Sequence, residues 1–165
     1  MVGAVLEDGS EVYSLPVDFT YEYKKNPTVL STNLAKDFIA KNPEAQKIID
    51  YAETFLGTPY VWGGTTPAGF DCSGFVQYVY GKNGYNLTRT TYTQWAKDGV
   101  DVAREDLEPG DLIYFGYGDS PSHVGIYVGD GTMIHSPRTG DVIRYSSIES
   151  GYYDNCYLGA RRIIE

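Results

Sequence analysis

Cys72 stands where a helix is expected to begin. Asp71 precedes it, and the apolar residues Phe75 and Val79 follow at the four-residue spacing of one helix face. An aspartate at the N-cap accepts hydrogen bonds from backbone N–H groups of the first turn, so Cys72 is expected at the helix N-terminus. The positive end of the helix dipole favours thiolate over thiol there. Residue type and position together indicate a nucleophile.

A cysteine nucleophile needs a base that takes its proton and a third group that orients the base. The chain contains two histidines. His123 is followed by Val124, Ile126 and Val128 at alternate positions, a pattern typical of a half-buried strand with His123 on the face away from the core. His135 ends the next short segment, which is expected to be the partner strand.

The loop between these strands decides whether the two histidines share a face. We expect a three-residue hairpin loop at 129–131, Gly-Asp-Gly. With this loop, Gly125 lies opposite His135, and His123 is the diagonal neighbour of His135 within side-chain reach. A two-residue loop would put the histidines on opposite faces.

Each of these residues has a structural interpretation when it is taken singly. A cysteine is most often a small buried apolar side chain, and a histidine is often a core or surface residue. The joint arrangement of Cys72, His123 and His135 instead matches nucleophile, base and orienting group. The three are also zinc-ligand types, but no fourth ligand and no Cys-x-x-Cys or His-x-x-x-His spacing accompanies them. We therefore expect neither a metal nor another cofactor.

Six motifs follow one another along the chain: GTPYVWGG at 57–64, DCSGFV at 71–76, RTTYTQ at 89–94, PGDL at 109–112, HVGIY at 123–127 and MIH at 133–135. In this order they resemble the NlpC/P60 cysteine peptidases, which cut bacterial cell-wall peptides. The resemblance runs from about residue 45 to the C-terminus. It implies a papain-like α+β fold in which Cys72 is the nucleophile, His123 the general base and His135 the residue that orients the base.

Five further residues are candidates for substrate binding. Tyr60 and Trp62 precede a Gly-Gly pair in a loop, where aromatic rings either form pocket walls or pack in the core. The resemblance implies that the Tyr60 hydroxyl supports the oxyanion with the backbone N–H of the nucleophile. It also implies that Asp71 and Ser73 hold the free amino group of an L-alanine. Arg89 has the planar fork that suits a substrate carboxylate, although a solvated or structural charge explains it equally well.

Length and apolar content indicate one domain with an appendage. The 165 residues and 42% apolar composition are enough for one full core but not for a second. A helix is expected at 45–56, with Asn42 as cap, Pro43 in the first turn and Gly57 as the stop. Further helices are expected after Cys72 and at 91–98. Antiparallel strands are expected from 111 to the last one at 157–164, so the fold class is α+β, with N-terminal helices packed on the sheet.

Residues 1–41 are expected to be an N-terminal extension and linker, a fragment of a preceding domain, and 42–165 the catalytic domain. The segment at 2–23 alternates like strands around an Asp8-Gly9 turn but is too short to be stable alone. A linker is expected at 24–32, and after it a helix that packs on the catalytic domain. We find no membrane-spanning run and no signal peptide, so the chain is either part of a longer exported protein or delivered otherwise, for example by a phage tail.

The net charge of −9 argues against nucleic acid as a partner and against electrostatic retention on an anionic wall. Targeting then depends on the substrate or on wall-binding domains outside this chain. We expect a monomer that works outside the cell or facing the wall, without insertion into the membrane. The second cysteine, Cys156, is expected to be buried and inert rather than bridged to Cys72.

The expected partner is a peptidoglycan stem peptide, and the expected reaction is hydrolysis of its bond between D-γ-glutamate and the diamino acid. Amidase or acyl-transfer chemistry on the same cysteine and histidine scaffold is one alternative. A wall-peptide binding module without turnover is another. The sequence leaves open whether the diamino acid is diaminopimelate or lysine, and whether intact wall or released peptides are cut.

Overall fold

The computed structural model describes residues 3–5, 11–15, 19–23 and 39–165. The chain divides into two units, residues 1–37 and 38–165. The division of roles between an extension at 1–41 and a catalytic domain at 42–165 stays a prediction. The expected Asp8-Gly9 turn, the linker and the helix after Thr32 lie outside the described residues.

The first unit contains a small antiparallel sheet. Its three strands are β1 (Gly3–Val5), β2 (Glu11–Leu15) and β3 (Phe19–Tyr23), and they pair in that order. Three short strands are near the lower limit for a sheet that is stable by itself.

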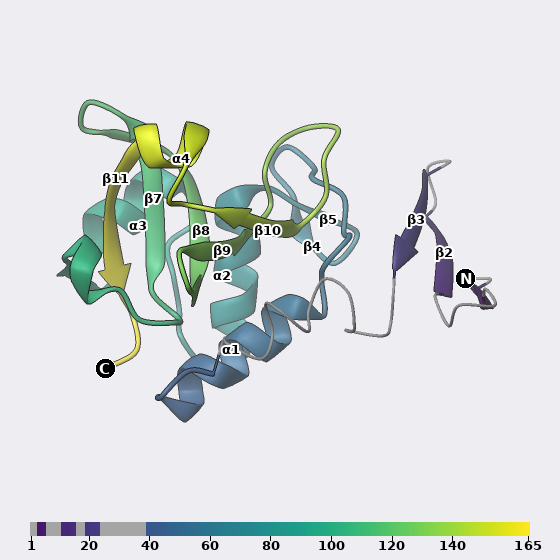
Figure 1. Ribbon diagram of the computed structural model, residues 1–165, viewed down its shortest axis with the longest axis horizontal. Coiled ribbons are helices and arrows are strands. Elements are labelled where there is room, and N and C mark those ends of the chain that lie inside the picture. The colour runs from purple at the N-terminus through teal and green to yellow at the C-terminus, as the bar shows by residue number, and fades with distance from the viewer. Residues whose placement is uncertain (1–2, 6–10, 16–18, 24–38) are drawn as a thin grey trace. The chain divides into compact units, whose positions relative to one another are not determined.

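The second unit is built on a six-stranded antiparallel sheet in the order β10-β9-β8-β7-β11-β6 (Figure 1). These strands are β6 (Val100–Val102), β7 (Leu112–Tyr117), β8 (Ser120–Gly129), β9 (Thr132–His135), β10 (Arg144–Ser147) and β11 (Tyr157–Arg162). A small separate hairpin consists of β4 (Thr65–Thr66) and β5 (Gly69–Phe70). The helices are α1 (Pro43–Glu53), α2 (Cys72–Lys82), α3 (Thr91–Lys97) and α4 (Gly151–Asn155), with a 3-10 turn, η1, at Arg104–Asp106. The α+β class expected from the sequence is confirmed.

Local capping explains where α1 begins. The Asn42 side chain accepts a hydrogen bond from the backbone N–H of Glu44 at 2.9 Å, and Pro43 occupies the first turn, where its missing N–H costs nothing. Gly57 follows the helix with a positive φ of 85°, which suits glycine. The expected cap and stop are confirmed, although the helix ends at Glu53 rather than at residue 56.

The start of α2 is fixed in the same way. The Asp71 side chain accepts a hydrogen bond from the backbone N–H of Gly74 at 2.6 Å, so Cys72 is the first helical residue, as expected. A Cβ atom on Gly74 would lie 2.1 Å from the carbonyl oxygen of Gly64. Glycine at this position therefore lets the helix end pack directly on the Gly-Gly loop.

The hairpin between β8 and β9 has a shorter loop than expected, but it puts the two histidines on one face, as expected. The prediction that His123 faces away from the core was wrong, because His123 lies opposite the buried Phe115 of β7. Asp130 and Gly131 alone form the loop, both with positive φ (47° and 61°), as in a turn that favours Asp-Gly. Gly129 pairs with Thr132, and a bulge at Val128 shifts the register by one residue. The prediction of a three-residue loop at 129–131 was therefore wrong. The bulge restores the alignment that such a loop would have given.

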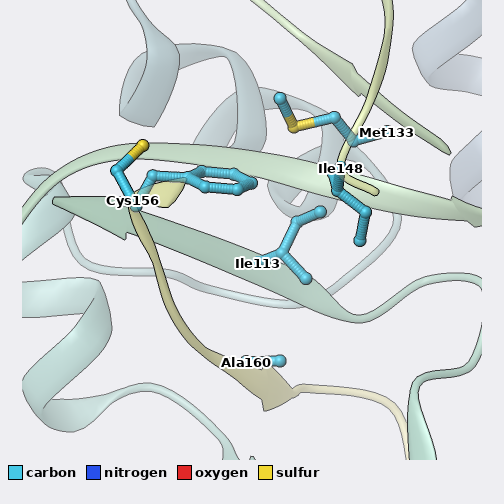
Figure 2. Packing of buried hydrophobic residues seen from close by; sticks show 6 residues of the cluster. Ile113, Met133, Ile148, Cys156 and Ala160 are labelled. Atoms are coloured by element: carbon cyan, nitrogen blue, oxygen red, sulfur yellow. The ribbon is translucent and has the colours of Figure 1, made fainter. Parts of the chain in front are cut away.

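Helices cover the two faces of the sheet. On one face, Trp95 of α3 packs on Tyr114 of β7, with ring centroids 5.1 Å apart. On the other face, Tyr153 of α4 packs on Phe115 at the same centroid distance. A buried cluster underlies this second face (Figure 2), and its members are Ile113, Phe115, Met133, Ile148, Cys156 and Ala160. Cys156 is free and buried in this cluster, as expected.

No helix in the described ranges has the length and apolar character needed to cross a membrane.

Candidate active site

The Cys72 thiol lies at the junction of two helix ends and the sheet. Its Sγ is 3.5 Å from Oγ1 of Thr91, the first residue of α3, and it also interacts with the backbone of Val124 in β8. Burial raises the pKa of this thiol above its ordinary value, and the hydrogen bond between the thiol and Thr91 only partly offsets the effect of burial. The expectation that the helix end favours a thiolate is therefore corrected: burial outweighs the helix end, and the resting group is a thiol.

The two histidines form a direct pair. Nε2 of His123 on β8 lies 2.7 Å from Nδ1 of His135 on β9, the distance of a hydrogen bond. Burial lowers the pKa of His123 to about 4, with a smaller contribution from the Arg144 charge. The pKa of His135 lies well below its ordinary value, mainly because of burial and then because of the charges of His123 and Arg144. Both imidazoles are therefore neutral at pH 7.

Beyond the histidine pair, β10 contributes a serine and an arginine. Nε2 of His135 lies 2.8 Å from Oγ of Ser146, and Nη1 of Arg144 donates a hydrogen bond to the same oxygen. These contacts are satisfied when His135 donates to Ser146 and accepts from His123, which is the tautomer set that a base at Nδ1 of His123 requires. The lone pair of His123 then lies on Nδ1, the nitrogen needed for a base. Sequence reasoning missed Ser146 and Arg144, because the only signal was their alternation on the strand that pairs with β9.

The structure thus joins His123 and His135 directly and brings Cys72 beside the residue that follows His123. Within the described part of the chain, Cys72 is hydrogen-bonded to Thr91 rather than to His123. Thr91 lies in the RTTYTQ motif at 89–94, and the sequence did not predict its contact with Cys72. The sequence feature that could have indicated a role for Thr91 is its position as the first residue of a short helix capped by Thr90.

Tyr60 and Trp62 occupy different environments. Burial first, and then the charges of Cys72 and Asp71, raise the pKa of the Tyr60 phenol, so Tyr60 lies near the thiol and keeps its proton. The side chain of Trp62 is 86% exposed. Core packing therefore does not explain Trp62, and its ring is accessible to a ligand.

Asp71, Ser73 and Arg89 form one hydrogen-bonded group. Nη2 of Arg89 donates to Oδ2 of Asp71 at 2.6 Å, and Nη1 donates to Oδ1 at 3.1 Å. Nη1 also donates to the Ser73 hydroxyl at 2.9 Å, and that hydroxyl donates to Asp71 at 3.3 Å. This two-point pairing fixes the Asp71 carboxylate beside the helix end. The roles of these three residues towards a substrate stay predictions.

Among the residues that the structure describes, no cluster of three or more His, Cys, Asp and Glu side chains is arranged to hold a metal ion. Nε2 of His123 and Nδ1 of His135 are hydrogen-bonded to each other, so this pair of nitrogens does not form a ligand pair for a metal ion. The geometry thus gives no support to the alternative zinc site.

Comparison with known proteins identifies the group to which this site belongs. The sequence profile described as the NlpC/P60 family matches residues 57–162. Over 125 residues the chain is 41% identical to a γ-D-glutamyl-L-lysine dipeptidyl-peptidase of Bacillus cereus. The chain belongs to the NlpC/P60 family. The aligned region is 74% of this chain and 37% of that relative.

Two solved NlpC/P60 structures resemble this chain. An NlpC/P60 family protein from Bacillus cereus has a TM-score of 0.71 at 34% identity, over 99% of this chain and 50% of that one. The NlpC/P60 domain of the peptidoglycan hydrolase SagA has a TM-score of 0.64 at 34% identity, over 71% of this chain and 97% of that one. The chain spans about two fifths of the length of the first curated relatives that it matches.

Proposed function

We propose that this NlpC/P60 protein is a cysteine peptidase of peptidoglycan stem peptides that hydrolyses the bond between D-γ-glutamate and the following diamino acid. Cys72 is the nucleophile, His123 the general base and His135 the residue that orients the base. The observation that carries the proposal is the 2.7 Å pair of neutral histidines, together with a helix-terminal thiol that contacts the backbone of Val124, the residue after His123. The name of the Bacillus cereus relative, a γ-D-glutamyl-L-lysine dipeptidyl-peptidase, supports the choice of bond.

The first half of the reaction forms an acyl-enzyme. Sγ of Cys72 attacks the γ-carbonyl carbon, and its proton passes to Nδ1 of His123. Hydrogen bonds between catalytic groups often tighten only when substrate binds, which is compatible with the thiol contacting Thr91 in the free protein. The Tyr60 hydroxyl and the backbone N–H of Cys72 stabilise the oxyanion. The C–N bond then breaks, and His123 gives its proton to the departing amine.

The second half regenerates the enzyme. His123 accepts a proton from water as the water oxygen attacks the thioester carbon, and the C–S bond breaks. The product carboxylic acid leaves, and the thiolate takes the proton back from His123. His135 accepts a hydrogen bond from Nε2 of His123 throughout, which keeps the lone pair of His123 on Nδ1. Because His135 is neutral, it stabilises the imidazolium less than a carboxylate would.

Substrate selection in this proposal depends on the acyl side of the site. Asp71 and Ser73 hold the amino group of an N-terminal L-alanine, Arg89 keeps Asp71 in place, and Trp62 forms a wall of the groove. The protein is bacterial or phage-borne, secreted or otherwise delivered to the wall, and monomeric. Additional wall-targeting domains act with it.

The products of the reaction test the choice of bond. The protein is incubated with purified peptidoglycan and with free L-Ala-γ-D-Glu peptides that carry either diaminopimelate or lysine, and the fragments are analysed by mass spectrometry. We expect new fragments that end at D-glutamate. Cleavage at another bond would replace the proposed specificity. A folded, reduced sample that cuts nothing would point to a binding module or to another acyl acceptor.

The pH dependence tests the protonation states. His123 must be neutral to act as a base, and burial lowers its pKa to about 4, so kcat/KM is expected to fall only below about pH 5. The Cys72 pKa is raised above its ordinary value of 9.0, and a thiol that transfers its proton during attack does not need prior ionisation. The profile of kcat/KM should therefore stay flat up to about pH 8.5.

Alkylation of Cys72 by iodoacetamide is a second test of the protonation states of Cys72 and His123. The rate is expected to be low at pH 7 and to rise towards and beyond pH 9, because the thiolate is the reactive form. Rapid alkylation at pH 6, with kcat/KM falling above pH 8, would instead indicate a resting thiolate–imidazolium pair and contradict the proposed protonation states.

A further inference from the structure

A positively charged cavity adjoins His123. It has a volume of about 380 Å³, and the side chains lining it include His123, Arg138, Arg144, Tyr152 and Tyr153. None of the described side chains that line it is a carboxylate. The net charge of the chain is −9, yet two arginines line this one cavity beside the candidate base.

The two arginines differ in how far their charges are neutralised. Arg144 is paired with Asp141, with 3.2 Å between Nε and Oδ2, and it also donates to Ser146. Arg138 has no side-chain hydrogen bond and no ion pair with any residue described by the structure, and it lies in the loop between β9 and β10. The positive charge of Arg138 is therefore available to a ligand in the cavity.

The tyrosines give the cavity apolar walls next to this charge. Tyr152 is 61% exposed, and its ring meets that of Tyr153 edge-on at a centroid distance of 5.2 Å. The Tyr153 ring in turn lies 5.9 Å from His123 and 5.2 Å from His135. Aromatic walls beside a free guanidinium suit a ligand with a short aliphatic chain that ends in a carboxylate.

The proposed reaction indicates which part of the substrate enters this cavity. A histidine that protonates the departing amine must reach the leaving nitrogen, so the residue attached to that nitrogen lies against His123. The groups proposed to hold the acyl side, Asp71, Ser73 and Tyr60, come from other segments, and none of them lines the cavity. The cavity is thus on the leaving-group side.

We infer that this cavity binds a carboxylate of the leaving diamino acid and that Arg138 is its principal partner. The inference rests on the proposed function and deepens it, because it names the chemistry that the leaving group must carry. Two sources supply such a carboxylate. One is the side chain of a dicarboxylic diamino acid such as diaminopimelate, and the other is the free C-terminus of a tripeptide that ends at the diamino acid.

Four peptides separate these sources. L-Ala-γ-D-Glu is extended with diaminopimelate or with lysine, and each tripeptide is made with a C-terminal acid or a C-terminal amide. Binding is measured by isothermal titration calorimetry to Cys72→Ala, which holds the intact peptide, and to the same protein with Arg138→Gln added. The matched control adds Lys97→Ala, which also removes one positive charge but from an exposed position in the last turn of α3, outside the cavity.

In the Cys72→Ala protein, and in the same protein with Lys97→Ala added, we expect the peptide that carries the recognised carboxylate to bind about tenfold more tightly than the peptide that lacks it. In the protein with Arg138→Gln added, we expect the carboxylate to have little effect on affinity. A difference between diaminopimelate and lysine assigns the side-chain carboxylate, whereas a difference between acid and amide assigns the C-terminus. Equal carboxylate preference with and without Arg138, or no peptide binding, would overturn the inference.

Turnover of the same peptides by the wild-type chain separates this inference from the proposed function. If the protein cleaves after D-glutamate but its preference among the peptides does not depend on Arg138, the proposed function is supported and the inferred carboxylate binding by the cavity is refuted. Binding that depends on Arg138 without any cleavage would support the cavity and refute the proposed peptidase reaction.

Discussion

The Cys72→Ala variant is expected to hydrolyse γ-D-glutamyl peptides at least about 10⁴-fold more slowly than the wild type, because it lacks the thiol that forms the proposed acyl-enzyme. The measurement is single-turnover and steady-state product formation on the peptide that the wild type cuts best. Stability should change little, since the polar contacts of the Cys72 thiol, such as the one at 3.5 Å to Oγ1 of Thr91, are weak. The thermal midpoint of the variant reports this directly.

Cys156→Ala is the matched control for this experiment. Cys156 is buried in the cluster beneath α4 and forms no disulfide with Cys72. Its loss is expected to lower the thermal midpoint slightly and to leave kcat/KM within about twofold of the wild type. If Cys72→Ala retained the wild-type rate, the covalent mechanism would be wrong.

The His135→Ala variant is expected to lose about 10²- to 10³-fold in kcat with KM little changed, and to retain measurable activity. The nucleophile and base remain, but Nε2 of His123 loses the acceptor at 2.7 Å that fixes its tautomer and ring orientation. The experiment compares kcat, KM and the folded fraction of variant and wild type under the same conditions.

His135→Gln separates positioning from simple structural loss. A glutamine offers a carbonyl oxygen that can accept the hydrogen bond from His123, so this variant is expected to be at least about tenfold more active than His135→Ala. A folded His135→Gln protein that is no better than His135→Ala would show that an acceptor alone does not suffice. Total loss in both folded variants would make His135 indispensable rather than supportive.

Residues close together in the sequence determined the parts of the site that were predicted correctly. Asp71 caps α2 because its side chain needs to reach only Gly74, three residues along the chain. The alternating pattern after His123 likewise depends on neighbours in one strand. Such short-range rules placed Cys72 at a helix end and His123 on a strand before any tertiary contact was known.

The β8–β9 hairpin shows where short-range reasoning becomes insufficient. The face shared by the histidines was predicted correctly from a loop that does not exist. The actual loop has two residues, and the bulge at Val128 compensates for the difference. A bulge leaves little trace in an apolar pattern, because it changes how two strands pair rather than which residues are apolar.

The protonation states and the charged partners were decided by tertiary structure alone. Burial beneath segments distant in the sequence raises the Cys72 pKa and lowers that of His123, and this reverses the expectation drawn from the helix end. Arg89 pairs with Asp71 across 18 positions of sequence. The sequence by itself therefore determined which groups are present and which local elements carry them. Only the packed chain decided their charge and their neighbours, because desolvation and ion pairing depend on residues that folding brings together from distant segments.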